Sequence, residues 1–196
     1  MAVDFSVKPV LTGDKVTLRP FAADDFPAIR AALLDPEVTR LTGSRPVAWD
    51  RAIEDRTRDW YDTRGAQADR LDLAVEDRAT GGWAGEVVLN QFDPDNASCN
   101  FRVMFGPGGR DRGLGTEAVR LIVGYGFARL GLHRIALEVY DFNPRARRVY
   151  EKAGFVAEGV LRDALCTADG WADATVMAIL ADDWRALPED RRARFD

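Results

Sequence analysis

Two glycines one residue apart, Gly113 and Gly115, stand directly before a helix-like run in the segment RDRGLGTEAV, residues 110–119. Glycines at a helix start let consecutive backbone N–H groups converge on one point, and the helix dipole adds about half a positive charge there. Because Arg110 and Arg112 flank that point, a doubly charged pyrophosphate suits it better than a carboxylate does. On spacing alone, a tight connection with solvated arginines explains the segment equally well.

The same glycines formally match the dinucleotide fingerprint G-x-G-x-x-G/A, with Ala118 as its last member and Glu138 as its acid. Seven residues, GPGGRDR, separate the preceding strand from Gly113, and only one strand-helix-strand unit is visible. A doubly wound sheet needs several such units, so a dinucleotide-binding oxidoreductase is disfavoured. A phosphate loop is excluded because the sequence contains no G-x-x-x-x-G-K-[ST].

Hydrophobic periodicity and turn signals predict the elements that must position this turn. The expected helices are 24–35, 49–65, 116–131 and 143–154. The expected strands are 15–21, 70–77, 82–92, 98–105, 133–141, 155–161 and 173–181. Three consecutive strands without an intervening helix indicate antiparallel hairpins, and the strand-helix-strand unit that follows indicates one parallel crossover. The fold class is therefore α+β, with a single mixed, mostly antiparallel central sheet flanked by helices.

Composition narrows the classes of function. Of the 196 residues 46% are hydrophobic and 30% charged, as in ordinary globular proteins. Cys99, Cys166 and His133 are too few and too scattered for a metal site, so we expect no metal. A net charge of -5 disfavours nucleic acid and favours a basic small molecule or peptide. No apolar run approaches the ~20 residues that span a bilayer, so we expect a cytoplasmic protein without membrane contact.

Two motifs together resemble the GNAT superfamily of N-acetyltransferases. RDRGLG resembles that family's R/Q-x-x-G-x-G/A signature, and LEVYDFNPRARRVYEKAGF (137–155) resembles its second motif, strand-Asn-helix-Tyr-x-x-x-Gly-Phe. The similarity is strongest over 103–155 and continues over about 16–184. Its last part resembles the branch that includes ribosomal-protein-alanine and polyamine acetyltransferases. The resemblance implies a GNAT-like fold in one domain over 1–196, with short flexible termini around that core.

Acetyl-CoA is the acyl donor that the resemblance implies, and its binding residues carry over position by position. The strand that ends at Met104 and Phe105 would splay from the next strand, so that pantetheine pairs with free backbone groups. Asn143 would contact the cofactor, and it is also the expected N-cap of the helix that follows. Backbone amides of the glycine turn would hold the pyrophosphate, namely those of Arg112, Gly113, Leu114, Gly115 and Thr116.

The implied reaction is direct attack of a primary amine on acetyl-CoA in a ternary complex, which needs an acid and a base. Tyr150 matches the family tyrosine that protonates the departing thiolate; alternatively, it only lines the buried face of its helix. Glu138 is the first choice as base, because its spacing to Asn143 and Tyr150 matches the ribosomal-protein-alanine acetyltransferases. Glu86 is the reserve base. Many relatives instead carry a glutamate in the strand where this chain reads SCNF (98–101).

Three aspects of function stay open at the level of sequence. A non-catalytic acyl-CoA-binding sensor is the alternative to an enzyme. The acceptor is an amine-bearing small molecule, a polyamine or a protein N-terminus, and a homodimer is compatible with the resemblance. Trp49, Trp60 and Tyr61 either belong to the core, which their helical spacing favours, or shape the acceptor pocket.

Overall fold

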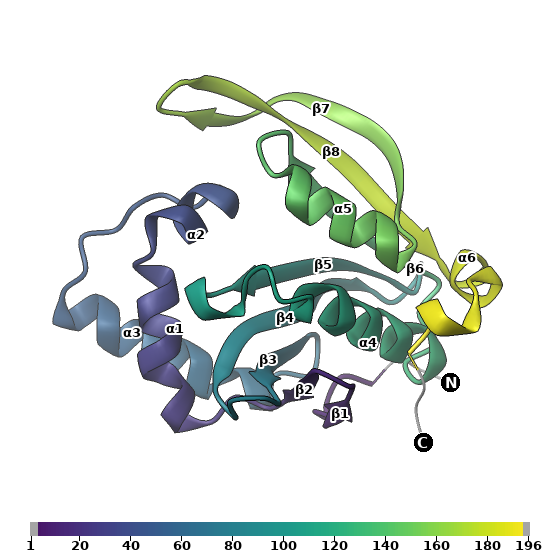
Figure 1. Cartoon of the computed structure of the whole chain (residues 1–196), viewed down its shortest axis with the longest axis horizontal. Helices are drawn as coiled ribbons and strands as arrows, with labels where there is room; N and C mark the ends of the chain where they lie inside the picture. Colours follow the sequence, from purple (N-terminus) through teal and green to yellow (C-terminus); the bar gives the residue numbers. More distant parts are fainter. Residues whose placement is uncertain (1–3, 194–196) are drawn as a thin grey trace.

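A computed structural model describes residues 4–193, in which eight strands form one mixed sheet (Figure 1). The strands are β1 (Leu11–Thr12), β2 (Val16–Arg19), β3 (Leu71–Asp77), β4 (Trp83–Asp93), β5 (Ser98–Phe105), β6 (Arg134–Tyr140), β7 (Val156–Thr167) and β8 (Gly170–Leu180). Their order across the sheet is β1-β2-β3-β4-β5-β6-β8-β7, and only the β5–β6 pair is parallel. This arrangement confirms the predicted fold class.

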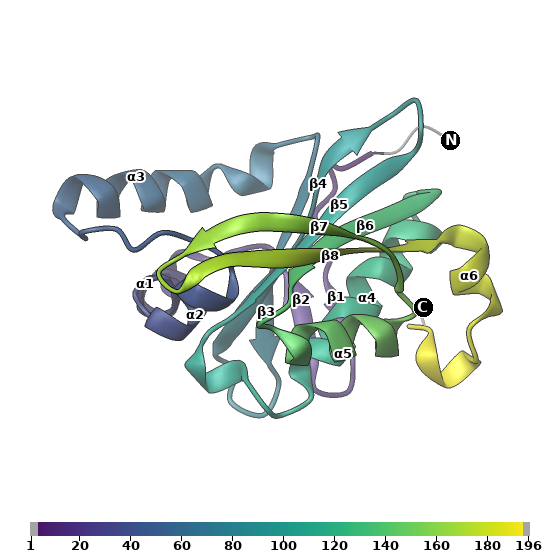
Figure 2. The ribbon, with the colours of Figure 1, turned by 90° about the horizontal axis from the view of Figure 1, so that it is seen from above.

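Within the described residues, six α-helices flank the sheet. They are α1 (Phe26–Leu33), α2 (Pro36–Leu41), α3 (Arg51–Asp62), α4 (Leu114–Ala128), α5 (Pro144–Ala153) and α6 (Ala181–Ala186). Helices α1, α2 and α3 gather at one end of the molecule in Figure 1, and Figure 2 shows α3 and α5 on opposite sides of the sheet. The parallel crossover predicted from the sequence is β5-α4-β6.

Several elements differ from the sequence-based prediction. Helices α2 and α6, of six residues each, and strand β1, of two, were missed because they are too short to display a period. Helix α4 ends at Ala128, before the expected stop at Gly131, which instead takes the left-handed conformation with φ 72°. Strand β7 continues to Thr167 rather than 161, because it is an edge strand exposed along most of its length and lacks an alternating apolar pattern. The predicted flexible ends include residues 1–3 and 194–196, which lie outside the described residues.

The two faces of the sheet have different surroundings. Residues of β4 and β5 that face α4, such as Val87 and Leu89, belong to one large apolar core together with Ile122 of that helix. On the other face Glu86 lies opposite Met104, and Val88 lies opposite Arg102. Because side chains alternate along a strand, the pattern that buries Val87 turns Glu86 and Val88 away from α4.

The parallel pair of strands is short and then opens. Strand β5 pairs with β6 only over Ser98–Asn100, opposite Arg134–Ala136. The rest of β5 and the rest of β6 have no mutual register, and Figure 1 shows the β7–β8 hairpin running away from β5. The opening that was expected before the glycine turn is therefore present, and it leaves backbone groups of 101–105 without ladder partners on that side.

Candidate active site

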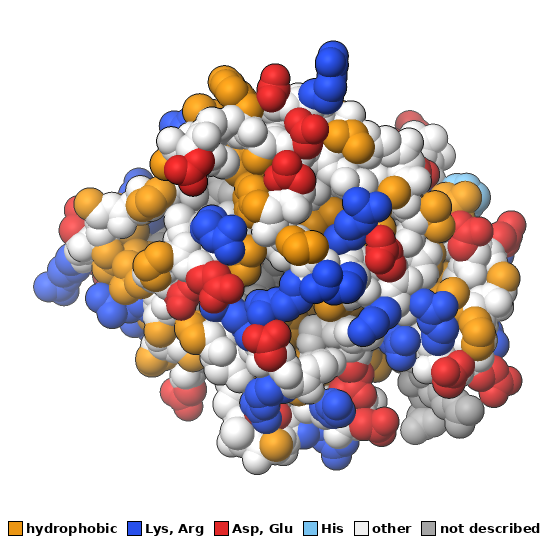
Figure 3. All heavy atoms as spheres, turned by 45° about the horizontal axis from the view of Figure 1, so that its top comes forward, with side chains coloured by type: hydrophobic (Ala, Val, Ile, Leu, Met, Phe, Trp, Pro, Cys, Tyr) orange, Lys and Arg blue, Asp and Glu red, His pale blue; other side chains and the backbone are white. Residues whose placement is uncertain are grey.

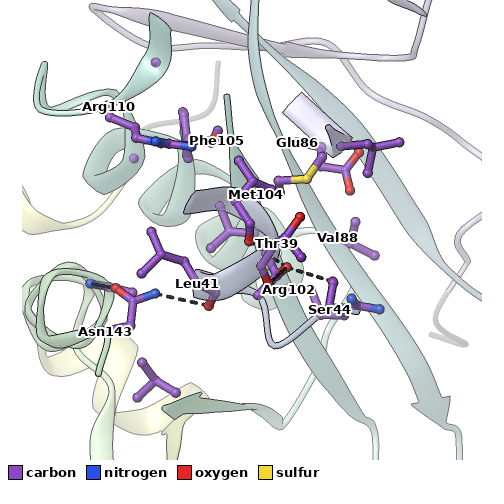
Figure 4. Close-up of a pocket in the computed structure, with 18 of the residues that line it drawn as sticks. Thr39, Leu41, Ser44, Glu86, Val88, Arg102, Met104, Phe105, Arg110 and Asn143 are labelled. Atoms are coloured by element: carbon purple, nitrogen blue, oxygen red, sulfur yellow. Dashed lines mark hydrogen bonds between the residues drawn. The ribbon is translucent and has the colours of Figure 1, made fainter. Parts of the chain in front are cut away.

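One cleft of about 900 Å³ runs along the opening between β5 and β6. Its walls come from α2, α3, β4, β5, β6 and α5, and from the glycine turn before α4. Figure 4 shows side chains from α2, β4 and β5 around the same space, together with Arg110 and Asn143. The cleft therefore brings together residues that lie up to about a hundred positions apart in the chain.

The glycine turn forms one end of the cleft. Gly113 is the N-cap of α4 and takes φ 80° and ψ 0°, a left-handed conformation that favours glycine. Within residues 4–193 no side chain caps this helix, and Gly113, Gly115 and Thr116 at its start line the cleft. Leu114 points into the core, so only its backbone can serve the turn.

The two arginines that flank the turn have different surroundings. Arg110 lines the cleft and donates hydrogen bonds to Asp35, at 3.0 Å, and to Glu37, both at the start of α2. Arg112 instead donates to the buried carboxylate of Asp77, at 2.5 Å, and does not line the cleft. This contact holds the pKa of Asp77 below its usual value. The structure thus keeps Arg110 at the predicted place and directs the Arg112 side chain elsewhere.

A lysine beside the turn was not identified from the sequence. The Nζ atom of Lys15 lies 3.2 Å from the point where a Cβ on Gly113 would stand. Glu117, in the first turn of α4, accepts hydrogen bonds from the backbone N–H groups of Asp14 and Lys15, at 2.7 and 2.8 Å. This long-range contact holds the lysine close to the turn. No local sequence motif indicates the contact.

The predicted residues of β5 and α5 lie on the same cleft. Met104 and Phe105 line it where β5 ends. The Oδ1 atom of Asn143 accepts a hydrogen bond from the Ala146 N–H, at 3.1 Å, which confirms the N-cap role. Its Nδ2 donates to the Leu41 carbonyl, at 3.4 Å, as drawn in Figure 4. Asn143 therefore also ties α5 to α2 across the cleft.

Tyr150 borders the cleft from α5 while its ring is packed in the core. The residue is 7% exposed, and its ring lies edge-on to Phe101 at 6.1 Å between centroids. Burial raises the pKa of the phenol above its usual value. The hydroxyl is therefore protonated at neutral pH, which is the state that a proton donor needs.

Glu86 enters the cleft from β4 and is half-buried. Its Oε2 atom accepts a hydrogen bond from the Tyr61 hydroxyl, at 2.8 Å. Burial disfavours the ionised carboxylate and raises the pKa of Glu86 to about 7, although the Tyr61 hydrogen bond opposes part of this shift. A carboxyl group with this pKa can accept and release a proton near neutral pH.

Glu138 also lines the cleft, from β6, but it is exposed. Its Cα lies opposite Val176 of β8, and among the described residues its carboxylate has no hydrogen-bond or ion-pair partner. Both carboxylates considered in the sequence analysis thus reach the same cavity, but only Glu86 is oriented by a neighbouring side chain.

Aromatic residues of α3 and of the loop before it contribute to the walls of the cleft. Trp49, Trp60 and Tyr61 all line it. Trp60 is 41% exposed and contacts the Arg64 guanidinium at 3.9 Å from its ring centre, so it is not a core residue. Tyr61 is buried, as expected of a core residue, and its hydroxyl also positions Glu86 on the wall of the cleft.

Two features are absent between residues 4 and 193. There, no cluster of three or more His, Cys, Asp or Glu residues has the arrangement of a metal site. No helix of that range is both long and apolar enough to cross a membrane.

Comparisons with known proteins assign this fold and cleft to a family. A family model described as an acetyltransferase (GNAT) domain matches residues 15–156. A probable N-acetyltransferase of Bacillus subtilis, YjcK, is 47% identical over 72 residues, which are 37% of this chain and 40% of that protein. Spermidine N(1)-acetyltransferase of Escherichia coli K12 is 27% identical over 171 residues, covering 87% of this chain and 89% of that protein.

Solved structures agree with the fold. A GCN5-related N-acetyltransferase from Brucella melitensis superposes with a TM-score of 0.78 at 26% identity, covering 97% of this chain and 87% of that one. Spermidine N-acetyltransferase from Vibrio cholerae, in complex with CoA and spermine, also gives 0.78, at 24% identity, covering 87% and 98%. The chain therefore belongs to the acetyltransferase (GNAT) domain family and is an N-acetyltransferase whose acetyl donor is acetyl-CoA.

Proposed function

We propose that this cleft transfers acetyl from acetyl-CoA directly to a primary amine, with Glu86 as the base and Tyr150 as the acid. The observation that carries the proposal is the placement of these two groups on one cavity. Glu86 comes from β4 and Tyr150 from α5, on either side of the opening between β5 and β6. A base and an acid on opposite sides of the donor site are what a direct transfer requires.

The donor-binding residues fit an extended, anionic ligand. The uncapped N–H groups of α4 and the glycine turn suit a pyrophosphate, with Lys15 and Arg110 as nearby cations. The unpaired edge of β5 at 101–105 suits pantetheine as an added strand. A band of Lys and Arg side chains across the face in Figure 3 agrees with an anionic donor, although the whole chain is acidic. Acetyl-CoA, when bound, supplies a thioester with a thiolate leaving group.

Proton transfer explains the need for both residues. A typical alkyl amine has a pKa of about 10.4 and is mostly protonated at pH 7, so it must lose a proton before it can attack. Glu86 accepts that proton, directly or through water, because its own pKa lies near 7. Tyr150 then delivers a proton to the departing sulfur. Glu138 remains the second candidate base on the same cleft.

A covalent acetyl-cysteine route is not supported. Cys99 is packed in the apolar core, where burial raises its pKa to about 12 and disfavours the thiolate nucleophile. Cys166 is exposed on β7 and does not line the cleft. Direct attack, which needs positioning and proton transfer only, is therefore preferred.

The acceptor classes expected from the sequence were protein N-termini, polyamines and other small amines. Because some relatives are named spermidine N(1)-acetyltransferases, polyamines are included among the amines to be tested. A homodimer and a cytoplasmic location stay predictions.

The experiment is amine-dependent release of CoA thiol from acetyl-CoA, measured with N-terminal peptides, polyamines, aminoglycosides and amino acids. Release with one class of amine supports the proposal and identifies the acceptor class. Binding of acetyl-CoA without release for any amine would instead favour the non-catalytic sensor.

The glycine turn gives a prediction about donor affinity. Replacing Gly113 with Ala strains a backbone at φ 80° by about 1–2 kcal/mol and places a Cβ 3.2 Å from Lys15 Nζ. We expect the Kd for acetyl-CoA, measured by calorimetry, to rise about 10-fold as the turn relaxes away from its converging N–H groups.

The matched control is Gly131→Ala at the far end of the α4 segment. Gly131 has φ 72° and open space where a Cβ would stand, so the backbone strain is comparable but the cleft is untouched. Its melting temperature should fall like that of Gly113→Ala while the Kd stays unchanged. An equal rise of Kd in both variants would show that general strain, and not the turn, weakens binding.

A further inference from the structure

The charges of the cleft differ from the charge of the chain. The protein carries a net charge of -5, yet Arg45, Arg56 and Arg102 line the acceptor side of the cleft. All three are exposed, and within residues 4–193 none of them forms an ion pair with a carboxylate. Three other arginines of the cleft are paired, namely Arg70 with Asp72, Arg110 with Asp35 and Arg145 with Asp111.

The carboxylates on the cleft do not balance these arginines. Asp111 is engaged by Arg145, and Glu86 is partly neutral at pH 7 because its pKa is raised to about 7. Glu138 is the remaining exposed carboxylate of the lining. A polyamine would bring several further positive charges into this field, and like charges in a cleft are an effective way to reject a ligand.

Arg102 is the cation nearest to the proposed base in the sheet. Glu86 lies opposite Met104, and Arg102 precedes Met104 by two residues, so Glu86 and Arg102 are diagonal neighbours on one face. Such neighbours have Cα atoms roughly 7–8 Å apart. The Arg102 charge also lowers the pKa of Glu86, which agrees with this proximity. Figure 4 shows both residues on the same cavity.

The position of Arg102 also separates it from the pyrophosphate site. It lies three residues before Phe105, the end of β5, so the strand places it roughly 10 Å before the chain turns toward the glycines. Its partner across the strands is Val88, on the face turned away from α4. Such a guanidinium would bind a second anion near Glu86, distinct from the phosphates of the donor.

We propose that the acceptor is an amine that also carries a carboxylate a few bonds from its nitrogen, and that Arg102 binds this carboxylate while Glu86 faces the amine. This inference rests on the proposed function of the cleft. The planar guanidinium can hold a carboxylate through two parallel hydrogen bonds. Arg45 and Arg56 extend the positive field toward solvent. The same chemistry is present in a free amino acid and in an acidic residue near a peptide N-terminus.

The test compares acceptors that differ only in the carboxylate. The wild type and Arg102→Gln are assayed for thiol release with glycine, alanine, β-alanine and γ-aminobutyrate, with their amides, and with spermidine. Peptides with Asp or Asn in second position form a separate arm that distinguishes the two sources. For the amino acid on which the wild type acts best, we expect kcat/KM to be about 10–100-fold higher than for the amide of the same amino acid.

Variants of the arginines separate binding from packing. Arg102→Gln should reduce this preference to about one, because it removes the partner of the carboxylate, and Arg102→Lys should restore part of it. Arg51→Gln is the control on α3, because its side chain is 95% exposed and outside the cleft. A preference for spermidine, or a preference for the carboxylate that survives in Arg102→Gln, would overturn the inference.

A failure of the proposed chemistry is distinguishable from a failure of this inference. If no amine releases thiol, binding of N-acetyl amino acids and their amides to the CoA-loaded protein is followed through the fluorescence of Trp49 and Trp60, which line the cleft. Binding that requires both the carboxylate and Arg102 supports the inference even then. Equal binding of acid and amide, or binding of neither, refutes it.

Discussion

Replacing Tyr150 with Phe lowers kcat by about 10²–10⁴-fold while the KM for acetyl-CoA stays within about threefold, if the phenol is the proton donor. The substitution keeps the ring, so the edge-on contact with Phe101 and the packing beside Phe155 are retained. It removes only a hydroxyl group whose pKa is raised by burial and which is therefore protonated throughout the physiological range.

The measurement is initial-rate kinetics with the best amine, together with the melting temperature of each variant. Tyr125→Phe on α4 is the matched control, because it is the same substitution in a half-buried residue outside the cleft. A Tyr150→Phe variant that turns over like the wild type would remove this residue from the mechanism. Equal losses in both variants would indicate a general effect of lost tyrosine hydroxyls.

Local sequence signals predicted the elements that carry the proposed donor site. Strand β5 has the predicted bounds, 98–105, because apolar alternation ends in a turn signal at each side. Helix α5 begins after Asn143 and ends before Gly154, which takes φ 102°, as its capping residues indicate. These features depend on neighbours in the chain, so they can be predicted without tertiary structure.

Other parts of the cleft depend on contacts between distant segments and could not be predicted in the same way. The hydrogen bond from Tyr61 to Glu86 joins residues 25 positions apart, and Arg110 meets Asp35 across 75 positions. The burial that raises the pKa of Glu86 exists only once distant segments enclose it, among them α3 with Tyr61. Sequence reasoning therefore identified both carboxylates as candidates but ranked Glu138 first, since its spacing to Asn143 and Tyr150 favoured it.

The second large effect is expected from replacing Glu86, and it distinguishes Glu86 from Glu138 as the base. We expect Glu86→Gln to lower kcat/KM by about 10²–10⁴-fold at pH 7, because the amide cannot accept a proton from the amine. In the wild type the carboxyl group is protonated below its pKa of about 7 and becomes a base above it. Log kcat/KM should therefore rise with pH at unit slope and level off above about 7, and Glu86→Gln should lose this limb.

Two further variants assign the limb to one carboxylate. Tyr61→Phe removes the hydroxyl that stabilises the ionised form of Glu86, so the pKa of Glu86 should rise and the limb should move to higher pH at an unchanged plateau. Glu138→Gln should leave the limb near 7. If Glu138→Gln abolishes the limb and Glu86→Gln retains it, Glu138 is the base, and the hydrogen bond from Tyr61 only stabilises a half-buried carboxyl group. The shift in Tyr61→Phe is decisive because the amine titrates at about 10 and cannot respond to this hydroxyl.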